Sequence, residues 1–218
     1  MTISSPDSWH PLGHVIVIDD DASVRRSLRT MLDRAGYDVR LYASADLFLS
    51  SPAVPSPAVI LLDMRMPGTT GVGLQSQLKV IAQHIPVVFV SGDSRPEEII
   101  TAMKQGAVDF LLKPFTAQAM MEVIERAMRL SEQAVVEANK SVQVSERLKR
   151  LTPRETEVCR WMVRGYSNQQ IAMLDGGASA TIKLHRARVM DKMGADTLPE
   201  LIDMLSGTDI PLSKLEQA

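Results

Sequence analysis

Three consecutive carboxylates, Asp19, Asp20 and Asp21, follow an apolar run at residues 15–18. Carboxylates repel one another, so such a cluster is stable only where a cation offsets the repulsion. Ligand sets made only of oxygen favour Mg²⁺ or Ca²⁺ over Zn²⁺. Lys113, which stands before a proline much later in the chain, supplies a second positive charge. These residue types predict an acidic, metal-binding pocket at the carboxyl end of a strand.

Asp63 follows another apolar run, at residues 59–62, and is the candidate reacting group of this pocket. Mg²⁺ keeps several of its waters, so Asp20, Asp63 and the main-chain carbonyl of Arg65 can supply the protein ligands. Asp19 can then act through a coordinated water. A carboxylate held in this way can attack a phosphorus atom, while the metal and Lys113 neutralise the developing charge.

The elements that must position these groups alternate along the first part of the chain. Apolar runs predict strands at 15–18, 39–42, 59–62, 86–90 and 108–112, and amphipathic segments predict helices at 22–35, 44–50, 71–82 and 95–105. Such strands are typical of a parallel sheet covered on both faces. The expected fold is a doubly wound α/β domain with five parallel strands and a ligand site outside their carboxyl ends.

Two further residues complete this edge of the predicted sheet. Ser91 follows the fourth run, and its hydroxyl can donate a hydrogen bond to a phosphoryl oxygen. Asp21 begins the helix that carries Val24 and Leu28, so we interpret it as a helix-start carboxylate and not as a metal ligand.

The remainder of the chain is helical and contains no strand pattern. Residues 131–150 are interpreted as an exposed linker helix with weak coiled-coil capacity, and a flexible, partly helical tether is the alternative. A capping box at Thr152–Glu155 starts a helix that ends at Gly165, and further helices are expected at 167–172, 180–193 and 198–205. A glycine turn before a basic helix is the pattern of a helix-turn-helix, and the whole segment is expected to be an all-α domain.

Charge is unevenly distributed along the chain. Its net charge is −2, yet residues 147–194 hold 10 basic and 4 acidic residues, a net charge of +6. A basic block of this size suits nucleic acid, and a solvated charged face is the alternative interpretation.

The motifs IDDD, LLDMRMPG, VFVSGD and FLLKPF, in this order and spacing, resemble the receiver domain of two-component response regulators, a flavodoxin-like fold, over residues 14–130. The resemblance implies phosphorylation by a sensor histidine kinase partner and Mg²⁺ as cofactor. It also implies a role for each matching residue: Asp63 as phosphoacceptor, Asp19 and Asp20 as the metal pair, Ser91 as switch hydroxyl, Phe110 as switch aromatic and Lys113 as the phosphate-sensing lysine.

The motifs LTPRE, RGYSNQQIA and TIKLHRARVMDKMGA, over residues 151–195, resemble the LuxR/FixJ-type helix-turn-helix, whose third helix enters the major groove of double-stranded DNA. Helical spacing separates a core face from a groove face and from candidate phosphate contacts. The core face has Ile182, Val189 and Met193; the groove face has Lys183, Leu184, Ala187 and Arg188; the phosphate contacts are Thr181, Arg186 and Lys192.

The chain departs from that pattern before the third helix. Asp175 and Gly177 stand where the LuxR-type pattern usually has large aliphatic residues, and Ala178 stands where it has a capping Ser or Thr. We expect Leu174 to fill the vacant core site and Ser179 to cap the recognition helix one residue late.

The predicted organisation is a flexible N-terminus at 1–13, a receiver domain at 14–130, a helical linker at 131–150 and a DNA-binding domain at 151–218. The leading hypothesis is a transcription factor that forms a homodimer on phosphorylation. The alternative is a signalling module whose altered helix-turn-helix serves protein contact. An aspartyl-phosphate hydrolase would need a general acid or base two residues after its nucleophile, where Arg65 stands, so no enzyme is expected. The N-terminal sequence has no apolar export segment, which favours a cytoplasmic protein without membrane contact.

Overall fold

The computed structural model describes residues 11–51, 54–82, 84–92 and 94–206. The chain divides into two compact units, up to residue 136 and from residue 137 onwards, and each is described by itself. Within the described ranges, no helix is both long enough and apolar enough to cross a membrane.

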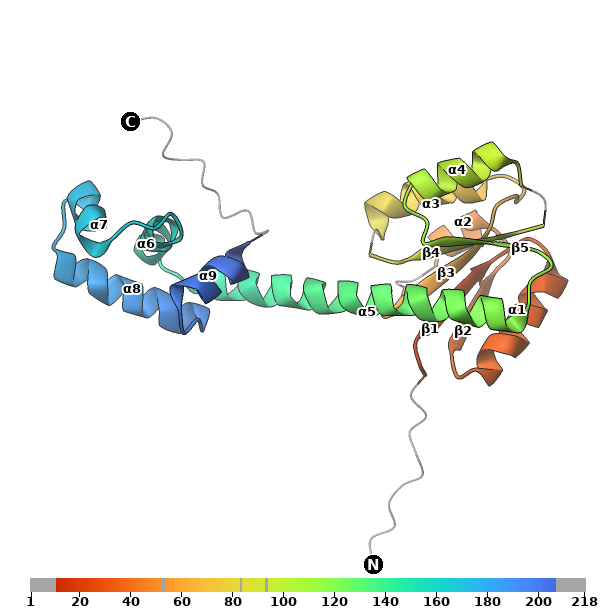
Figure 1. Cartoon of the computed structure of the whole chain (residues 1–218), viewed down its shortest axis with the longest axis horizontal. Coiled ribbons are helices and arrows are strands. Elements are labelled where there is room, and N and C mark those ends of the chain that lie inside the picture. Colours follow the sequence, from red (N-terminus) through yellow and green to blue (C-terminus); the bar gives the residue numbers. More distant parts are fainter. Residues whose placement is uncertain (1–10, 52–53, 83, 93, 207–218) are drawn as a thin grey trace, which may run out of the picture. The chain divides into compact units, whose positions relative to one another are not determined.

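The first unit is a five-stranded parallel sheet with helices on both faces (Figure 1). The strands pair in the order β2-β1-β3-β4-β5, which confirms the predicted doubly wound fold. The strands are β1 His14–Ile18, β2 Asp38–Tyr42, β3 Ala58–Asp63, β4 Val87–Ser91 and β5 Asp109–Leu112. The helices are α1 Ala22–Arg34, α2 Ala45–Leu49, α3 Gly71–Ile81, α4 Pro96–Lys104 and α5 Ala117–Leu148.

Alternate residues of the central strands fill two separate cores. Ile16 and Ile60 belong to the cluster that includes residues of α2, α3 and α4. Val17 and Leu61, their neighbours along β1 and β3, belong to the cluster that includes residues of α1 and α5. Because both faces of the sheet are covered, these strands carry unbroken apolar runs, as the sequence pattern predicts.

The reversal of strand order between β1 and β3 creates the place where a ligand binds in folds of this type. Asp19 follows β1 and Asp63 ends β3, so both lie at this reversal. Asp21 caps α1: its Oδ1 accepts hydrogen bonds from the main-chain N–H groups of Ser23, at 2.6 Å, and Val24, at 3.4 Å. The interpretation of Asp21 as a helix-start carboxylate is therefore confirmed.

Helix α5 is continuous over Ala117–Leu148, so the boundary between the two units falls within it. In the first unit, the buried Ser131 Oγ accepts a hydrogen bond of 2.9 Å from the main-chain N–H of Ala58, at the start of β3. In the second unit, Val144 is buried in the helical core and Leu148 packs against it. Residues that the sequence analysis assigns to an exposed linker thus contribute to the interiors of both units.

The second unit consists of the end of α5 and four further helices: α6 Pro153–Val163, α7 Asn168–Asp175, α8 Ser179–Met193 and α9 Leu198–Leu205. Helix α8 packs against α6 and α7, and α9 packs against α6. Ile182, Val189 and Met193 are fully buried, as the predicted core face of α8 requires.

Two expectations for the turn between α7 and α8 are wrong. Leu174 does not fill a core site, since it is 58% exposed. Helix α7 continues to Asp175 and thereby turns the Leu174 side chain outward. Ser179 does not cap α8 but is its first helical residue, and the N-cap position belongs to Ala178, which makes no side-chain hydrogen bond there.

Candidate functional site

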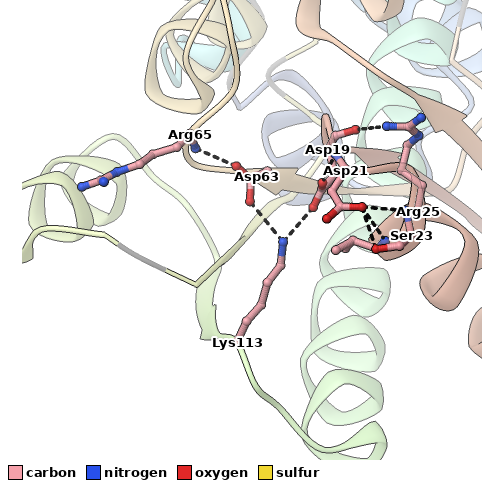
Figure 2. A network of polar contacts seen from close by, with 8 residues as sticks. Asp19, Asp21, Ser23, Arg25, Asp63, Arg65 and Lys113 are labelled. Carbon is pink, nitrogen blue, oxygen red and sulfur yellow. Dashed lines mark hydrogen bonds and ion pairs between the residues drawn. The ribbon is translucent and has the colours of Figure 1, made fainter.

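A shared lysine joins two buried carboxylates at the reversal between β1 and β3. Lys113 Nζ donates hydrogen bonds to Asp19 Oδ2, at 2.8 Å, and to Asp63 Oδ1, at 3.2 Å (Figure 2). Asp19 and Asp63 are only 3% and 7% exposed. Lys113 comes directly after β5, so three strand ends supply this network. The structure therefore brings together three of the residues that the sequence motifs single out.

The second oxygen of each carboxylate is held by main chain. Asp63 Oδ2 accepts a 2.7 Å hydrogen bond from the N–H of Arg65, and Asp19 Oδ1 accepts one of 2.8 Å from the N–H of Asp21. The main-chain carbonyl of Asp19 in turn accepts a 2.6 Å hydrogen bond from Arg25 Nη1. These contacts fix the orientation of both carboxylates (Figure 2).

Burial and charge oppose one another in this pocket. Burial raises the pKa of Asp63 above its usual value, and the Asp19 carboxylate adds to the increase, although Lys113 and the N–H of Arg65 lower it. Burial alone would lower the pKa of Lys113, but its hydrogen bonds and ion pairs with Asp19 and Asp63 outweigh burial and leave this pKa raised. The pocket therefore stabilises added positive charge.

The start of α3 approaches β3 so closely that only glycine fits there. A Cβ added to Gly71 would lie 2.4 Å from the main-chain oxygen of Asp63 and 2.9 Å from Phe89. The main-chain N–H of Gly71 donates a 3.1 Å hydrogen bond to the carbonyl of Met64. Gly71 thereby keeps the loop after Asp63 tight, a role that the sequence analysis missed.

The predicted trio of acidic ligands is only partly assembled. Asp20 is exposed, whereas Asp19, expected to act through water, is the carboxylate that shares Lys113 with Asp63. In the part of the chain that the structure describes, no three His, Cys, Asp or Glu side chains gather closely enough to hold a metal ion. A buried pair of carboxylates nevertheless suits Mg²⁺, which binds through one or two carboxylates and retains water.

The other predicted receiver residues lie on β4 and β5. Ser91 is 2% exposed at the end of β4, and its main-chain oxygen accepts a 2.9 Å hydrogen bond from the N–H of Lys113. Phe110 pairs with Phe89 in the sheet, is half-buried and packs against the core beneath α2, α3 and α4.

Arg65 also links the loop after Asp63 to the start of α4. Its Nη2 lies 3.3 Å from Glu98 Oε2, and the same carboxylate oxygen accepts a 2.9 Å hydrogen bond from the N–H of Arg95. The sequence predicts a role for the main-chain carbonyl of Arg65 and places its side chain two residues after Asp63, but local spacing does not point to a partner in α4.

Helix α8 of the second unit presents basic side chains on its exposed face. The side chains of the predicted groove face are exposed, while the opposite face of α8 is buried: the exposed residues are Lys183, Leu184, Ala187 and Arg188. Thr181 is exposed as well. This separation gives α8 one free face of the kind that enters a major groove.

Two predicted phosphate contacts have intramolecular partners. Lys192 Nζ donates a 2.6 Å hydrogen bond to Glu155 Oε2, and Glu155 is 2% exposed. Arg186 Nη1 donates a 3.0 Å hydrogen bond to the carbonyl of Tyr166. Lys192 in particular compensates a buried charge, which the helical spacing of α8 does not reveal. The capping-box position of Glu155 in α6 was the available signal for that carboxylate.

Comparison with known proteins assigns both units. Residues 15–125 match the response regulator receiver domain family, and residues 149–205 match the luxR family of bacterial regulatory proteins. The transcriptional regulatory protein FixJ of Bradyrhizobium diazoefficiens is 38% identical, with 87% of this chain and 93% of FixJ covered. The tetrathionate response regulatory protein TtrR of Salmonella typhimurium is 36% identical, with 85% of this chain and 88% of TtrR covered.

A solved structure of the response regulator StyR has a TM-score of 0.77 and 36% sequence identity, and covers 89% of this chain and 98% of its own. The matched families and the relatives extend over the sheet with its acidic pocket and over the helical unit with its basic face. The chain therefore belongs to the LuxR/FixJ class of two-component response regulators, transcriptional regulators with a receiver domain followed by a LuxR-type DNA-binding domain.

Proposed function

We propose that Asp63 is the phosphorylated residue of this response regulator and that its phosphorylation by a sensor histidine kinase controls sequence-specific DNA binding by α8. The observation that carries the proposal is the Lys113 ammonium, held between Asp19 and Asp63 at the β1/β3 reversal. A cation in this position lies beside the oxygen atoms of any phosphoryl group that is bound to Asp63.

The chain's own residues account for most of the reaction. One carboxylate oxygen of Asp63 attacks the phosphorus atom of the kinase's phosphohistidine, the P–N bond breaks and the imidazole leaves. The N–H of Arg65 and Lys113 set the orientation of the attacking carboxylate. The new aspartyl phosphate carries more negative charge than the carboxylate it replaces. Lys113, anchored at 2.8 Å by Asp19, then pairs with the phosphoryl oxygens in place of the Asp63 carboxylate.

Asp19 and Asp63 are the proposed side-chain ligands of a Mg²⁺ ion, with Asp20 and the main-chain carbonyl of Arg65 as further oxygen donors. When bound, Mg²⁺ supplies charge neutralisation for the transferring phosphoryl group. Burial of both carboxylates supports this assignment, because a buried acidic pair is stabilised by a cation.

The signal is proposed to leave the pocket through Ser91 and Phe110. Ser91 lies at the end of β4, next to β3, and its hydroxyl donates to a phosphoryl oxygen in this proposal. Half-buried Phe110 on the neighbouring strand β5 then packs differently against the core. Moving the active population from 1% to 99% requires roughly 5.5 kcal/mol of preferential stabilisation.

The output is proposed to be a homodimer whose two α8 helices contact successive major grooves of DNA, about 34–36 Å apart. Lys183, Leu184, Ala187 and Arg188 face the bases in this proposal, and Thr181 and Arg186 approach the phosphates. The exposure of the groove face supports the first group. We no longer assign Lys192 to phosphate, since it neutralises Glu155.

Phosphate incorporation from acetyl phosphate, measured by mass spectrometry with Mg²⁺ present, tests the acceptor. Asp63→Asn should abolish incorporation, and Lys113→Met should reduce it. Asp33→Asn is the matched control, because Asp33 is an exposed aspartate of α1 paired with Arg29. Undiminished incorporation by the Asp63 variant would refute the assignment.

DNA binding is tested with a duplex that the phosphorylated parent enriches from a random-sequence pool. Lys183→Ala combined with Arg188→Ala should reduce affinity at least tenfold, and Lys149→Ala, an exposed lysine paired with Glu146, is the control. A shallow dependence of affinity on salt would favour the alternative function, a helix-turn-helix that contacts protein, because phosphate contacts impose a steep slope.

A further inference from the structure

The departure from the LuxR-type pattern places an acidic side chain at the end of α7. Asp175 is the last residue of this helix, and its side chain is only 13% exposed. A carboxylate there is unfavourable twice over, because burial removes its hydration and the carboxyl end of a helix carries partial negative charge. A position of this kind requires a cationic partner.

Arg154, in the first turn of α6, provides that partner. Its Nη2 forms an ion pair with Asp175 Oδ2, and its Nη1 donates a 2.8 Å hydrogen bond to Glu157 Oε2, one turn along α6. The two guanidinium nitrogens therefore tie the start of α6 to the end of α7. Arg154 is 41% exposed, so it stays better hydrated than Asp175.

The turn between α7 and α8 is held by the main-chain N–H groups of Gly176 and Gly177, which donate to the carbonyl of Ala172, and by this ion pair. Gly176 adopts a left-handed conformation, with φ of 68°, and Ala178 supplies no side-chain cap to α8. Met173 and Leu174 are exposed, at 82% and 58%. The Asp175 carboxylate lies close to the turn itself, since a Cβ added to Gly177 would come within 3.0 Å of Asp175 Oδ2. Fixing Asp175 thus fixes the backbone that leads into α8.

We propose that Arg154 is a positioning residue for DNA binding, which acts through Asp175 to set the α7–α8 turn and so the direction in which α8 presents its groove face. The inference rests on the proposed DNA-binding function. With Arg154 beside it, the Asp175 side chain can occupy a position where the LuxR-type pattern usually has a large aliphatic residue. The competing explanation for any effect of Arg154 on DNA affinity is a direct contact with a phosphate group.

The test uses the full-length chain and the duplex enriched from a random-sequence pool by the phosphorylated parent. Arg154→Ala should weaken specific binding at least tenfold, because it leaves the Asp175 carboxylate buried without a partner. Arg154→Ala combined with Asp175→Asn should return affinity to within threefold of the parent, because a neutral amide can stay packed at the end of α7, where an uncompensated carboxylate cannot. Glu157→Gln, which removes the other partner of the same guanidinium, is the matched control and should change affinity less than twofold.

The salt dependence of binding separates positioning from direct contact. A positioning role leaves the slope of log affinity against log salt unchanged in the Arg154→Ala, Asp175→Asn double variant, whereas loss of a phosphate contact lowers its magnitude by about 0.9. Persistent weak binding in the double variant, or a reduced slope, would overturn the proposal. So would unchanged affinity in Arg154→Ala.

Folding is followed in parallel through the fluorescence of Trp161. Its ring packs edge-on against that of Tyr166, with 4.9 Å between the ring centroids. If Arg154→Ala does not fold, the double variant still decides, because it must both fold and bind. A parent chain that enriches no sequence from the pool would reject the proposed function itself, and the inference with it. Enrichment by the parent without rescue in the double variant would reject the inference alone.

Discussion

Removal of Lys192 should destabilise the DNA-binding unit at least as much as removal of the charge on its partner, Glu155. Glu155 Oε2 accepts hydrogen bonds from Lys192 Nζ at 2.6 Å and from the N–H of Thr152 at 2.9 Å. The glutamate is 2% exposed, whereas the lysine side chain is 32% exposed. Lys192→Met therefore leaves a buried carboxylate without its cation, but Glu155→Gln leaves a lysine that can turn toward water.

The size of the effect follows from the pKa of Glu155. The hydrogen bond from Lys192, helped by the N–H of Thr152, lowers this pKa from 4.5 to about 2. At 1.36 kcal/mol per pKa unit, this decrease corresponds to about 3 kcal/mol of stabilisation of the ionised form. Breaking a buried pair from the lysine side costs roughly 3–5 kcal/mol. Glu155→Gln should cost up to about 3 kcal/mol, because the neutral side chain lacks this stabilisation of the ionised form.

The same shift predicts a pH dependence with a definite sign. Because the pKa of Glu155 is lower in the folded state than in the unfolded state, its contribution is fully present above pH 4.5 and is lost as the pH falls toward 2. Glu155→Gln should therefore flatten the stability profile of this unit in the acidic range, compared with the parent.

Trp161 makes the measurement specific to the second unit. The chain has two tryptophans, so Trp9→Phe leaves Trp161 as the only one. Urea unfolding followed by its fluorescence, at several pH values, gives the free energy of unfolding. In a separate experiment, the same fluorescence is followed on heating. Lys192→Met should then lower the melting temperature by roughly 12 °C or more, since 1 kcal/mol shifts the melting temperature of a 60–100-residue domain by about 4–8 °C. A loss below about 1 kcal/mol, or one smaller than that of Glu155→Gln, would refute this reasoning, because a buried charge costs several kcal/mol without its partner.

Two further variants test the acidic pocket. Asp63→Asn should raise the melting temperature of the receiver unit. Burial raises the pKa of Asp63, so its ionised form destabilises the fold at every pH above that pKa, and a neutral isostere removes the cost. Circular dichroism on heating measures this, and a lower melting temperature would contradict it. Gly71→Ala should cost about 1–3 kcal/mol through overpacking and should slow phosphorylation, because the new Cβ meets the Asp63 carbonyl. Gly73→Ala is its control on the same helix, where the nearest atom to a new Cβ is 3.3 Å away.

Local patterns in the sequence predicted the features that depend on local physics. The central strands β1, β3 and β4 are buried on both faces, so each appears as an unbroken apolar run such as residues 59–62. Parallel strands bring their carboxyl ends to one edge, which is why Asp63 and Lys113 could be placed together before their distance was known. The cap formed by Asp21 was likewise predictable from its position before α1.

The remaining features depend on contacts between residues far apart in the chain. Lys192 was assigned to DNA because spacing along α8 leaves it outside the core face, yet its partner Glu155 lies in α6. The sequence pattern presents Asp175 as a loss of packing, because an ion pair with Arg154 cannot be inferred from the composition of the turn. Local spacing also could not decide which of Asp19 and Asp20 would turn inward beside Asp63.

Helix α5 carries interior residues of both units, and this limits how such proteins can exchange parts. The receiver match ends at residue 125, but Ser131 binds the first residue of β3; the luxR match begins at 149, but Val144 belongs to the helical core. A hybrid joined at either of those limits would leave one half without a residue that its interior requires. Only a junction between residues 132 and 143 gives each half its complete interior. We therefore expect recombination between such regulators to give folded proteins when the junction lies in the middle of α5. Junctions at residue 125 or residue 149, where the family matches end and begin, should not.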